Sequence, residues 1–141
     1  MTYGQSTSML ITNSKRKTRF LVGIAGGSGS GKTTLARKLI EECEKIGIAG
    51  RILSLDNYYR PLDHLKFEKR KAYNFDHPNA IDSTLALKHI KELCAGRSVR
   101  QPIYNFKLHT REKATTICHP TKLIIIEITP NTTRVINTFF S

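Results

Sequence analysis

One stretch decides the fold: Phe20-Leu21-Val22-Gly23-Ile24-Ala25-Gly26-Gly27-Ser28-Gly29-Ser30-Gly31-Lys32-Thr33. Its first part, residues 20–25, is a continuous apolar run, which is typical of a strand buried on both faces of a sheet. Its second part is a loop rich in glycine and serine. Beyond the loop, apolar residues recur at helical spacing until Gly47, a typical helix end: Leu35, Leu39, Ile40, Cys43 and Ile46. We therefore predict a strand, a loop and an amphipathic helix in this order.

The same order of elements occurs a second time. Residues 51–55 predict a strand that ends at Asp56. A helix is then predicted from an N-cap at Asp82 or Ser83 to a stop at Gly96. Its apolar positions are Leu85, Leu87, Ile90, Leu93 and Cys94.

A third apolar segment, residues 122–127, is short, rich in isoleucine and ends in Glu127. This pattern is typical of a central parallel strand. Residues 99–118 contain two β-prone pieces around a polar segment and predict a hairpin or an extended loop. Because strands alternate with helices, we predict an α/β fold, with a parallel sheet, flanking helices and right-handed crossovers.

The composition excludes several classes of protein. The chain has 141 residues, of which 39% are hydrophobic and 24% charged, as in one globular domain and unlike collagenous, disordered or disulfide-stabilised chains. No apolar stretch approaches the ~20 residues of a membrane span, and residues 9–11 are too short for a secretory signal. We expect a cytoplasmic protein with no membrane partner. The three cysteines lack metal-ligand spacing, so we interpret them as reduced packing residues.

The formal net charge of +12 favours polyanionic partners. The basic residues are dispersed, which argues against a dedicated nucleic-acid surface. Residues 1–18 are rich in serine and threonine, end in a basic cluster and show no structural period, so we expect a flexible leader.

The glycine-rich loop has the spacing GxxxxGK[ST] between a predicted strand and a predicted helix. Glycines allow the backbone to wrap a triphosphate, the helix N-terminus favours the negative charge, and Lys32 can reach the β- and γ-phosphates. Thr33 has the hydroxyl that holds Mg²⁺ in such loops. The alternative is a merely flexible loop. The predicted phosphate-binding residues are Gly26, Gly27, Ser28, Gly29, Ser30, Gly31, Lys32, Thr33 and Thr34.

Two acids end predicted strands next to this loop. Glu127 occupies the place where a carboxylate meets Mg²⁺ directly or through water, although a strand-end acid can also be unrelated to a metal. Asp56 can act as a second metal ligand or as the base that accepts a proton from an attacking hydroxyl. We therefore predict a metal site formed by Thr33, Glu127 and Asp56.

Further motifs complete a resemblance. They are Leu53-Ser54-Leu55-Asp56-Asn57-Tyr58-Tyr59, Asn74-Phe75-Asp76-His77-Pro78-Asn79-Ala80-Ile81-Asp82, and Pro102-Ile103-Tyr104-Asn105-Phe106 with His109-Thr110-Arg111. In order and spacing, residues 20–127 closely resemble the uridine kinase (uridine-cytidine kinase) family, whose fold is of the P-loop NTPase type. The FDHP motif and the later YxFxxHxR pattern are far more specific than the phosphate loop.

The resemblance implies a nucleoside kinase of pyrimidine salvage that uses Mg²⁺ with ATP or GTP and converts uridine or cytidine to UMP or CMP. It implies that Asp56 and Lys32 are catalytic, that Asp76 binds the ribose, and that Tyr104 and His109 read the base. It also implies that Tyr59, Phe75 and Phe106 pack around the base, for which core packing is the alternative. We interpret His77 as structural, because the following proline favours an extended backbone, and Arg111 as a phosphate contact or an exposed side chain.

The resemblance ends after Glu127. We therefore divide the chain into a leader (1–18), a kinase-like domain (19–127) and a divergent tail (128–141). The family continues with further strands and an arginine-bearing lid, whereas Arg134 is the one basic residue after Glu127. We expect a truncated sheet, an unpaired edge along residues 20–25, poor solubility, impaired turnover and doubtful oligomerisation. The alternative function is a catalytically inactive nucleotide-binding fragment or pseudoenzyme.

Overall fold

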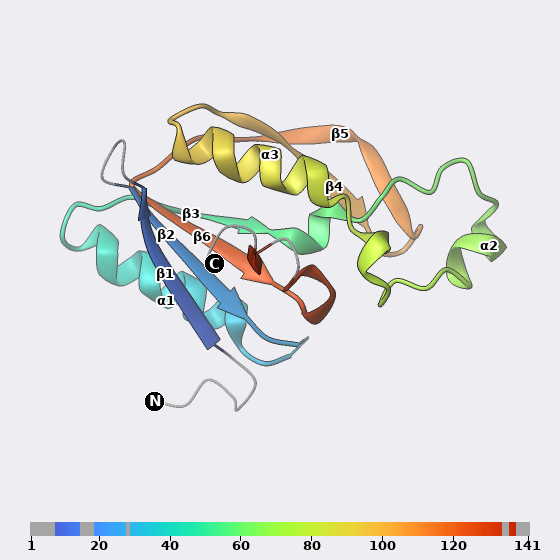
Figure 1. The fold of residues 1–141 in the computed structure, drawn as a ribbon, viewed down its shortest axis with the longest axis horizontal. Coiled ribbons are helices and arrows are strands. Elements are labelled where there is room, and N and C mark those ends of the chain that lie inside the picture. Colours follow the sequence, from blue (N-terminus) through green and yellow to red (C-terminus); the bar gives the residue numbers. More distant parts are fainter. Residues whose placement is uncertain (1–7, 15–18, 28, 134–135, 138–141) are drawn as a thin grey trace.

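The structure is a computed structural model that describes residues 8–14, 19–27, 29–133 and 136–137. A four-stranded sheet has the order β1-β2-β6-β3, and β4 and β5 form a separate hairpin (Figure 1). The strands are β1 (Ser8–Ser14), β2 (Arg19–Ala25), β3 (Gly50–Ser54), β4 (Val99–Asn105), β5 (Thr110–Cys118) and β6 (Leu123–Ile128). The helices are α1 (Lys32–Glu44), α2 (Phe67–Lys71) and α3 (Ser83–Cys94).

The centre of the sheet is parallel. β6 pairs with β2 on one side, with Phe20 opposite Leu123, and with β3 on the other, with Gly50 opposite Leu123. Every residue of β6 is buried, which confirms the predicted central strand. Because the three strands run in one direction, their carboxyl ends meet at one edge, and the phosphate loop, Asp56 and Glu127 lie there.

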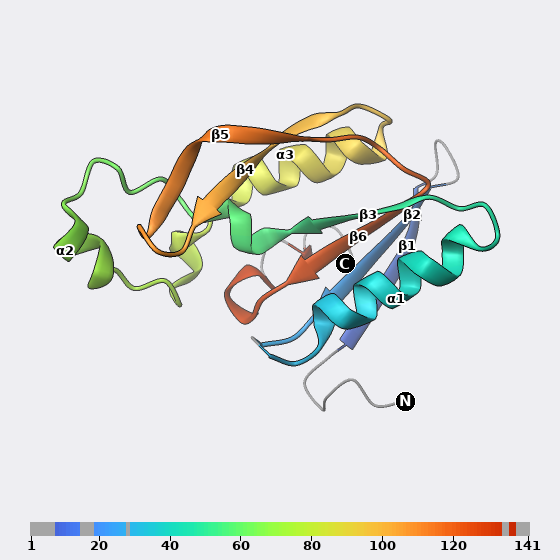
Figure 2. The same ribbon diagram turned by 180° about the vertical axis from the view of Figure 1, so that it is seen from behind.

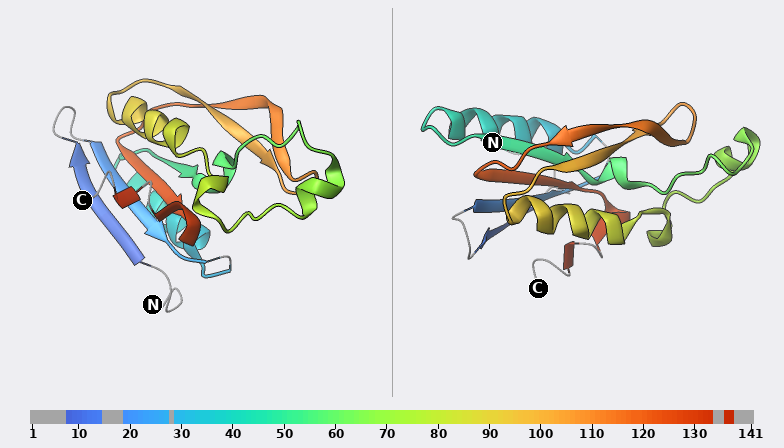
Figure 3. Two further views of the ribbon diagram at one scale, coloured as in Figure 1. Left: turned by 45° about the vertical axis from the view of Figure 1, so that its right-hand side comes forward. Right: turned by 90° about the horizontal axis from the view of Figure 1, so that it is seen from above.

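The two faces of the sheet carry different layers. Figure 3 shows α1 and α3 on opposite sides of the sheet, and Figure 2 shows α1 in front of the sheet, running roughly along the strands. On the α1 face, Val22, Ile24 and Ile125 pack with Ala36. On the other face, Ile124 and Ile126 belong to a larger core with Ile90 and Leu93 of α3. The alternate residues of β6 therefore serve two cores, as expected for a strand covered on both faces.

The structure corrects the expectation for the leader and for the sheet edge. Residues 8–14 form β1, which pairs antiparallel with β2 from Ser8 opposite Ala25 to Ser14 opposite Arg19. β1 satisfies the backbone groups on the free side of β2, so the edge expected to be open along residues 20–25 is covered and the expected aggregation hazard there loses its basis. The remaining leader residues, 1–7 and 15–18, lie outside the described residues, as do residues 134–135 and 138–141 of the tail.

The other predicted elements are confirmed. Residues 99–118 form the β4–β5 hairpin, and Asp82 is the N-cap of α3, with Oδ1 accepting from the Leu85 amide at 3.2 Å. The three cysteines are free thiols. Helix α2 was not predicted; it projects from the rest of the molecule beside the tip of the hairpin (Figure 1). Among the described residues, no helix is long and apolar enough to span a bilayer.

The buried state of β6 gives a stability prediction. Ile125→Val removes one methyl group from a fully buried side chain, and we expect it to lower the free energy of unfolding by about 0.5–1.5 kcal/mol. Ile117→Val on β5, where the residue is 47% exposed, is the matched control and should change it by less than about 0.5 kcal/mol. Urea denaturation followed by circular dichroism measures both, and equal effects would contradict the central position of β6.

Candidate active site

The phosphate loop lies between β2 and α1. Gly29 and Gly31 have φ angles of 76° and 87°, which are left-handed and favour glycine. The Gly26 amide donates to the Ile128 carbonyl at 3.2 Å and so ties the start of the loop to the end of β6. Gly31, the N-cap of α1, makes no side-chain cap hydrogen bond. The loop thus leads into a helix N-terminus, which attracts anions. Ser28 lies outside the described residues.

A cleft of about 420 Å³ opens at this loop. Its lining consists of predicted site residues: Gly29, Gly31, Lys32, Thr33, Thr34, Asp56 and Glu127. Lys32 is buried, and its Nζ donates to the Gly26 carbonyl at 3.3 Å. A cation, a helix N-terminus and two hydroxyl side chains therefore face one hollow beside two carboxylates, an arrangement suited to a phosphate group with a divalent cation.

Asp56 occupies the single 3₁₀ turn Leu55–Tyr58 that follows β3 directly. Burial raises the pKa of Asp56 above its ordinary value; Lys32 opposes this shift and Glu127 adds to it. A carboxylate with a raised pKa is a stronger proton acceptor than an exposed one. The environment of Asp56 therefore suits a general base.

Glu127 is the penultimate residue of the central strand β6, and it is buried. Its Oε1 atom has no hydrogen-bond partner among the described residues, and a buried charged oxygen is costly unless a cation or a donor meets it. The described residues contain no group of three or more His, Cys, Asp and Glu suited to a metal. Mg²⁺ needs none, because it binds through one or two carboxylates together with phosphate oxygens and water. Thr33, Asp56 and Glu127, which line one cleft, therefore fit a nucleotide-bound Mg²⁺.

Two further hollows continue from the phosphate cleft. The first, about 490 Å³, shares Lys32 and Asp56 with it and is also lined by Gly27, Tyr59, Asp76, Phe106, Thr129 and Pro130. The second, about 230 Å³, is the aromatic pocket formed by Tyr59, Phe75, Tyr104, Phe106 and His109. Tyr59 and Phe106 line both of these hollows. The shared residues make a path from the phosphate loop past Asp56 and Asp76 to the aromatic pocket.

The rings of the aromatic pocket are in mutual contact. The Tyr104 ring centroid lies 5.1 Å from that of Tyr59 and 5.0 Å from that of Phe106, and Phe75 lies 5.7 Å from His109. Phe106 is 59% exposed and Phe75 is partly buried, so neither belongs to the hydrophobic core. Aromatic faces at the rim of a hollow are suited to stacking on a flat ligand.

The Tyr104 hydroxyl is buried and has no hydrogen-bond partner among the described residues. Burial raises the pKa of Tyr104 to about 12, and the nearby phenols of Tyr59 and Tyr73 add to the shift. The hydroxyl therefore keeps its proton at neutral pH. It is a donor and acceptor available to a polar edge of a bound ligand.

The structure also shows the surroundings of His77 and Arg111. His77 is structural as predicted: its backbone is extended, and its Nδ1 accepts from the Asn79 amide at 3.0 Å. Arg111 is neither exposed nor at the phosphate cleft. Its Nη2 donates to the Tyr59 carbonyl at 3.0 Å and lies 3.6 Å from Asp82 Oδ2, so the interpretation of Arg111 as an exposed side chain was wrong.

Sequence reasoning missed the residues that hold the pocket from outside. Arg70 donates to the carbonyls of Leu62 and Leu65, both at 2.9 Å, and to that of Leu108 at the hairpin tip at 3.3 Å. Asn57 Oδ1 accepts from the Tyr104 amide at 3.2 Å. An arginine that binds backbone carbonyls leaves no sequence signal. Asn57 does leave one, because it follows Asp56 directly in the motif of residues 53–59.

The comparisons with known proteins place this site in a family. The model of the phosphoribulokinase / uridine kinase family matches residues 21–133. The chain belongs to this family. Uridine kinases of Clostridium tetani and Clostridium novyi are 43% identical over 111 residues and 45% identical over 107 residues. These alignments cover 79% and 76% of this chain but 52% and 50% of the relatives, so the chain spans about half of their length.

Solved structures of kinases share the fold. A possible uridine kinase from Bacillus stearothermophilus has a TM-score of 0.57 at 24% identity over 77% of this chain and 59% of that one. A putative fructose transport system kinase from Silicibacter has a TM-score of 0.68 at 18% identity over 89% of this chain and 64% of that one. The predicted α/β class, a parallel sheet with flanking helices, is confirmed.

The phosphate cleft predicts the effect of removing its cation. Lys32→Ala should weaken ATP binding at least about tenfold, because the phosphates lose their point charge. Lys38→Ala, on the exposed side of α1, is the matched control and should leave the dissociation constant within about twofold. Isothermal titration calorimetry measures both constants. Equal affinity of the Lys32 variant and the unaltered protein would contradict the assignment of the loop.

The burial of Asp56 predicts a gain in stability on its removal. Since the pKa of Asp56 is raised in the fold, ionisation of Asp56 opposes folding, and this opposition shrinks as the pH falls through the raised pKa and is lost below the ordinary pKa of the unfolded chain. Asp56→Asn should therefore raise the free energy of unfolding at pH 7, and the gain should shrink at acid pH. Asp63→Asn, at an exposed position, is the control. Urea denaturation at pH 7 and pH 4 tests this, and a destabilised Asn variant at pH 7 would contradict it.

Proposed function

We propose that the protein is a nucleoside kinase that transfers the γ-phosphoryl group of ATP, or of GTP, to the 5′-hydroxyl of uridine or cytidine, giving UMP or CMP in pyrimidine salvage. The observation that carries the proposal is the place of Asp56, which lines both the phosphate cleft and the neighbouring hollow that leads to the aromatic pocket. A base at this junction lies between a triphosphate and a nucleoside bound on either side. The similarity to uridine kinases supports the substrate class.

In the proposed reaction Asp56 accepts the proton of the 5′-hydroxyl while its oxygen attacks the γ-phosphorus. The bond between this phosphorus and the bridging oxygen breaks, and the nucleoside diphosphate leaves with the bonding electrons. Lys32 balances charge on the β- and γ-phosphates. Thr33, Glu127 and Asp56 would hold the accompanying Mg²⁺, which supplies charge neutralisation between these phosphates.

The nucleoside would lie across the second hollow and the aromatic pocket. Asp76 is exposed in the hollow between Asp56 and the aromatic rings, where its carboxylate can accept hydrogen bonds from a ribose diol. The base would stack among Tyr59, Phe75 and Phe106, with the Tyr104 hydroxyl and the His109 ring available to its polar edge. All of these residues were predicted from the sequence.

One observation favours a second candidate, a nucleotide-binding protein with little or no turnover. Lys32 is the only lysine or arginine that lines the three hollows in the described part of the chain. Phosphoryl transfer depends on positive charge placed at the transferring group, and one arginine is worth about 10³–10⁵ in rate. Binding can persist without that charge, because it needs the loop and not the transition-state contacts.

Formation of UMP from radiolabelled uridine and Mg·ATP separates the two candidates. As a nucleoside kinase, the protein should form UMP, at a rate at least about 10³-fold below that of the Clostridium tetani relative. Asp56→Asn should lower this rate further, by about 10²–10⁴. ATP binding without any UMP would support the second candidate, and a rate equal to that of the relative would contradict the inference drawn from the single cation.

Asp76 predicts a separation between the two ligands. Asp76→Ala should weaken uridine binding about tenfold or more, since a charged acceptor for the ribose is lost. ATP affinity should stay within about twofold, because Asp76 does not line the phosphate cleft. Calorimetric titration with each ligand measures this, with Glu68→Ala on α2 as the control. Equal weakening of both ligands would show that Asp76 supports the fold instead.

A further inference from the structure

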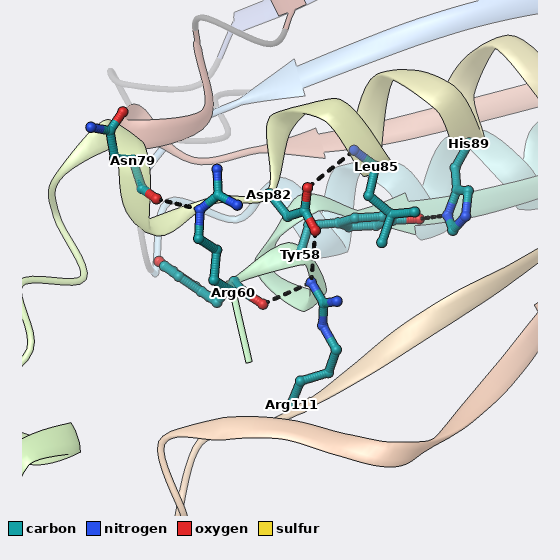
Figure 4. Close-up of polar contacts among 8 residues, drawn as sticks. Tyr58, Arg60, Asn79, Asp82, Leu85, His89 and Arg111 are labelled. Carbon is teal, nitrogen blue, oxygen red and sulfur yellow. Dashed lines mark hydrogen bonds and ion pairs between the residues drawn. The ribbon is translucent and has the colours of Figure 1, made fainter. Parts of the chain in front are cut away.

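Figure 4 shows two polar contacts around the Leu55–Tyr58 turn, and the side chains that make them line none of the three hollows. In the first, Arg111 of β5 joins the Tyr59 carbonyl, at 3.0 Å, to the Asp82 carboxylate, at 3.6 Å. In the second, the Tyr58 hydroxyl lies 2.7 Å from Nδ1 of His89 on α3. Asp82 is also the N-cap of α3. The contacts therefore connect the hairpin, the Leu55–Tyr58 turn and α3.

The connected elements are those that carry opposite ends of the proposed substrate. Asp56 lies in the turn, and Tyr59 follows it as a wall of the aromatic pocket. The remaining walls include Tyr104, Phe106 and His109, which belong to the hairpin or its tip. The distance between the carboxylate of Asp56 and the aromatic pocket thus depends on the position of the hairpin relative to the Leu55–Tyr58 turn.

We infer that Arg111, held by Asp82, is a positioning residue that sets the hairpin and its aromatic pocket at a fixed place relative to Asp56. The inference rests on the proposed nucleoside kinase function. Arg111 lines neither the phosphate cleft nor the aromatic pocket. It acts through the backbone of Tyr59 and through the N-terminus of α3.

The burial of the pair supports this role. The side chains of Arg111 and Asp82 are 16% and 22% exposed, so solvent screens their attraction less than that of a surface pair. Arginine suits a bridge between a carbonyl and a carboxylate, because its guanidinium presents several donors in one plane. A second hydrogen bond between the hairpin and residues 55–59 runs from the Tyr104 amide to Asn57 Oδ1.

The far side of the turn is held by the Tyr58–His89 pair. Burial lowers the pKa of His89, and the charge of Lys88 adds to the shift, so the ring is neutral at pH 7. Burial also raises the pKa of Tyr58, so an uncharged phenol and an uncharged imidazole share this hydrogen bond. The Tyr58–His89 pair therefore joins the turn to α3, and Arg111 joins the hairpin to Tyr59 and to the N-cap of α3.

Ligand binding tests the inference with matched variants. Arg111→Met removes the bridge, and Asp82→Asn removes its charge but keeps a good helix N-cap. Each should raise the dissociation constant of uridine about tenfold, the effect of losing one charge-assisted hydrogen bond, and leave that of ATP within about twofold. Lys113→Met, an exposed position two residues along β5, should change neither constant.

The double variant tests whether the two residues act as one unit. Arg111→Met with Asp82→Asn should bind uridine no more weakly than Arg111→Met alone, within about twofold, because coupled residues are not additive. Unchanged uridine binding in Arg111→Met would overturn the inference. Equal weakening of uridine and ATP would also overturn it, since that result indicates a general loss of structure.

Hydrogen exchange without ligand keeps the inference separate from the proposed function. Arg111→Met should speed amide exchange in residues 55–59 and 103–110 while leaving β2 and β6 unchanged. If the unaltered protein does not bind uridine, the proposed function fails, and this measurement still decides the positioning role. Exchange that is unchanged in both segments, or faster throughout the sheet, would refute it.

Discussion

The parallel pairing of β6 with β2 and β3 is the constraint on which the rest of the structure depends. It places the ends of three strands at one edge, so a loop after residue 25, an acid after residue 55 and an acid at residue 127 become neighbours. Side chains remote in the sequence form one cleft for this reason alone. The apolar residues of β6 supply two cores at once, which fixes the edge firmly enough to carry charged groups.

The part of the site that follows directly from this constraint could be predicted from the sequence. The phosphate loop, Asp56 and Glu127 each adjoin a strong strand signal, and the strand direction brings them together. The aromatic pocket could be predicted from the resemblance to the uridine kinase family, because Tyr59, Phe75 and Tyr104 lie in the motifs that carry this resemblance. β1 could not be predicted, because its apolar segment spans only a few residues and it forms a strand by pairing with β2. Arg70 and Arg111 could not be predicted either, because they bind carbonyl oxygens that every residue possesses.

The site also shows a conflict between stability and chemistry. Burial raises the pKa of Asp56, which strengthens it as a base and at the same time opposes folding while it is ionised. The buried Glu127 oxygen adds a second charge without a described partner. The fully buried strand β6 offsets both costs, and a cation in the cleft would reduce them. The two carboxylates that oppose folding therefore lie beside or within the strand that is buried throughout.

The pairing of β1 with β2 has a consequence for the order of folding. A hairpin between neighbouring strands closes a short loop and forms within microseconds, whereas the β2–β6 ladder joins residues as remote as Phe20 and Leu123. During synthesis, β2 therefore finds β1 long before β6 leaves the ribosome. Until β6 is synthesised, β2 has one edge paired with β1. Only its other edge, which later pairs with β6, is then available for non-native pairing with another strand.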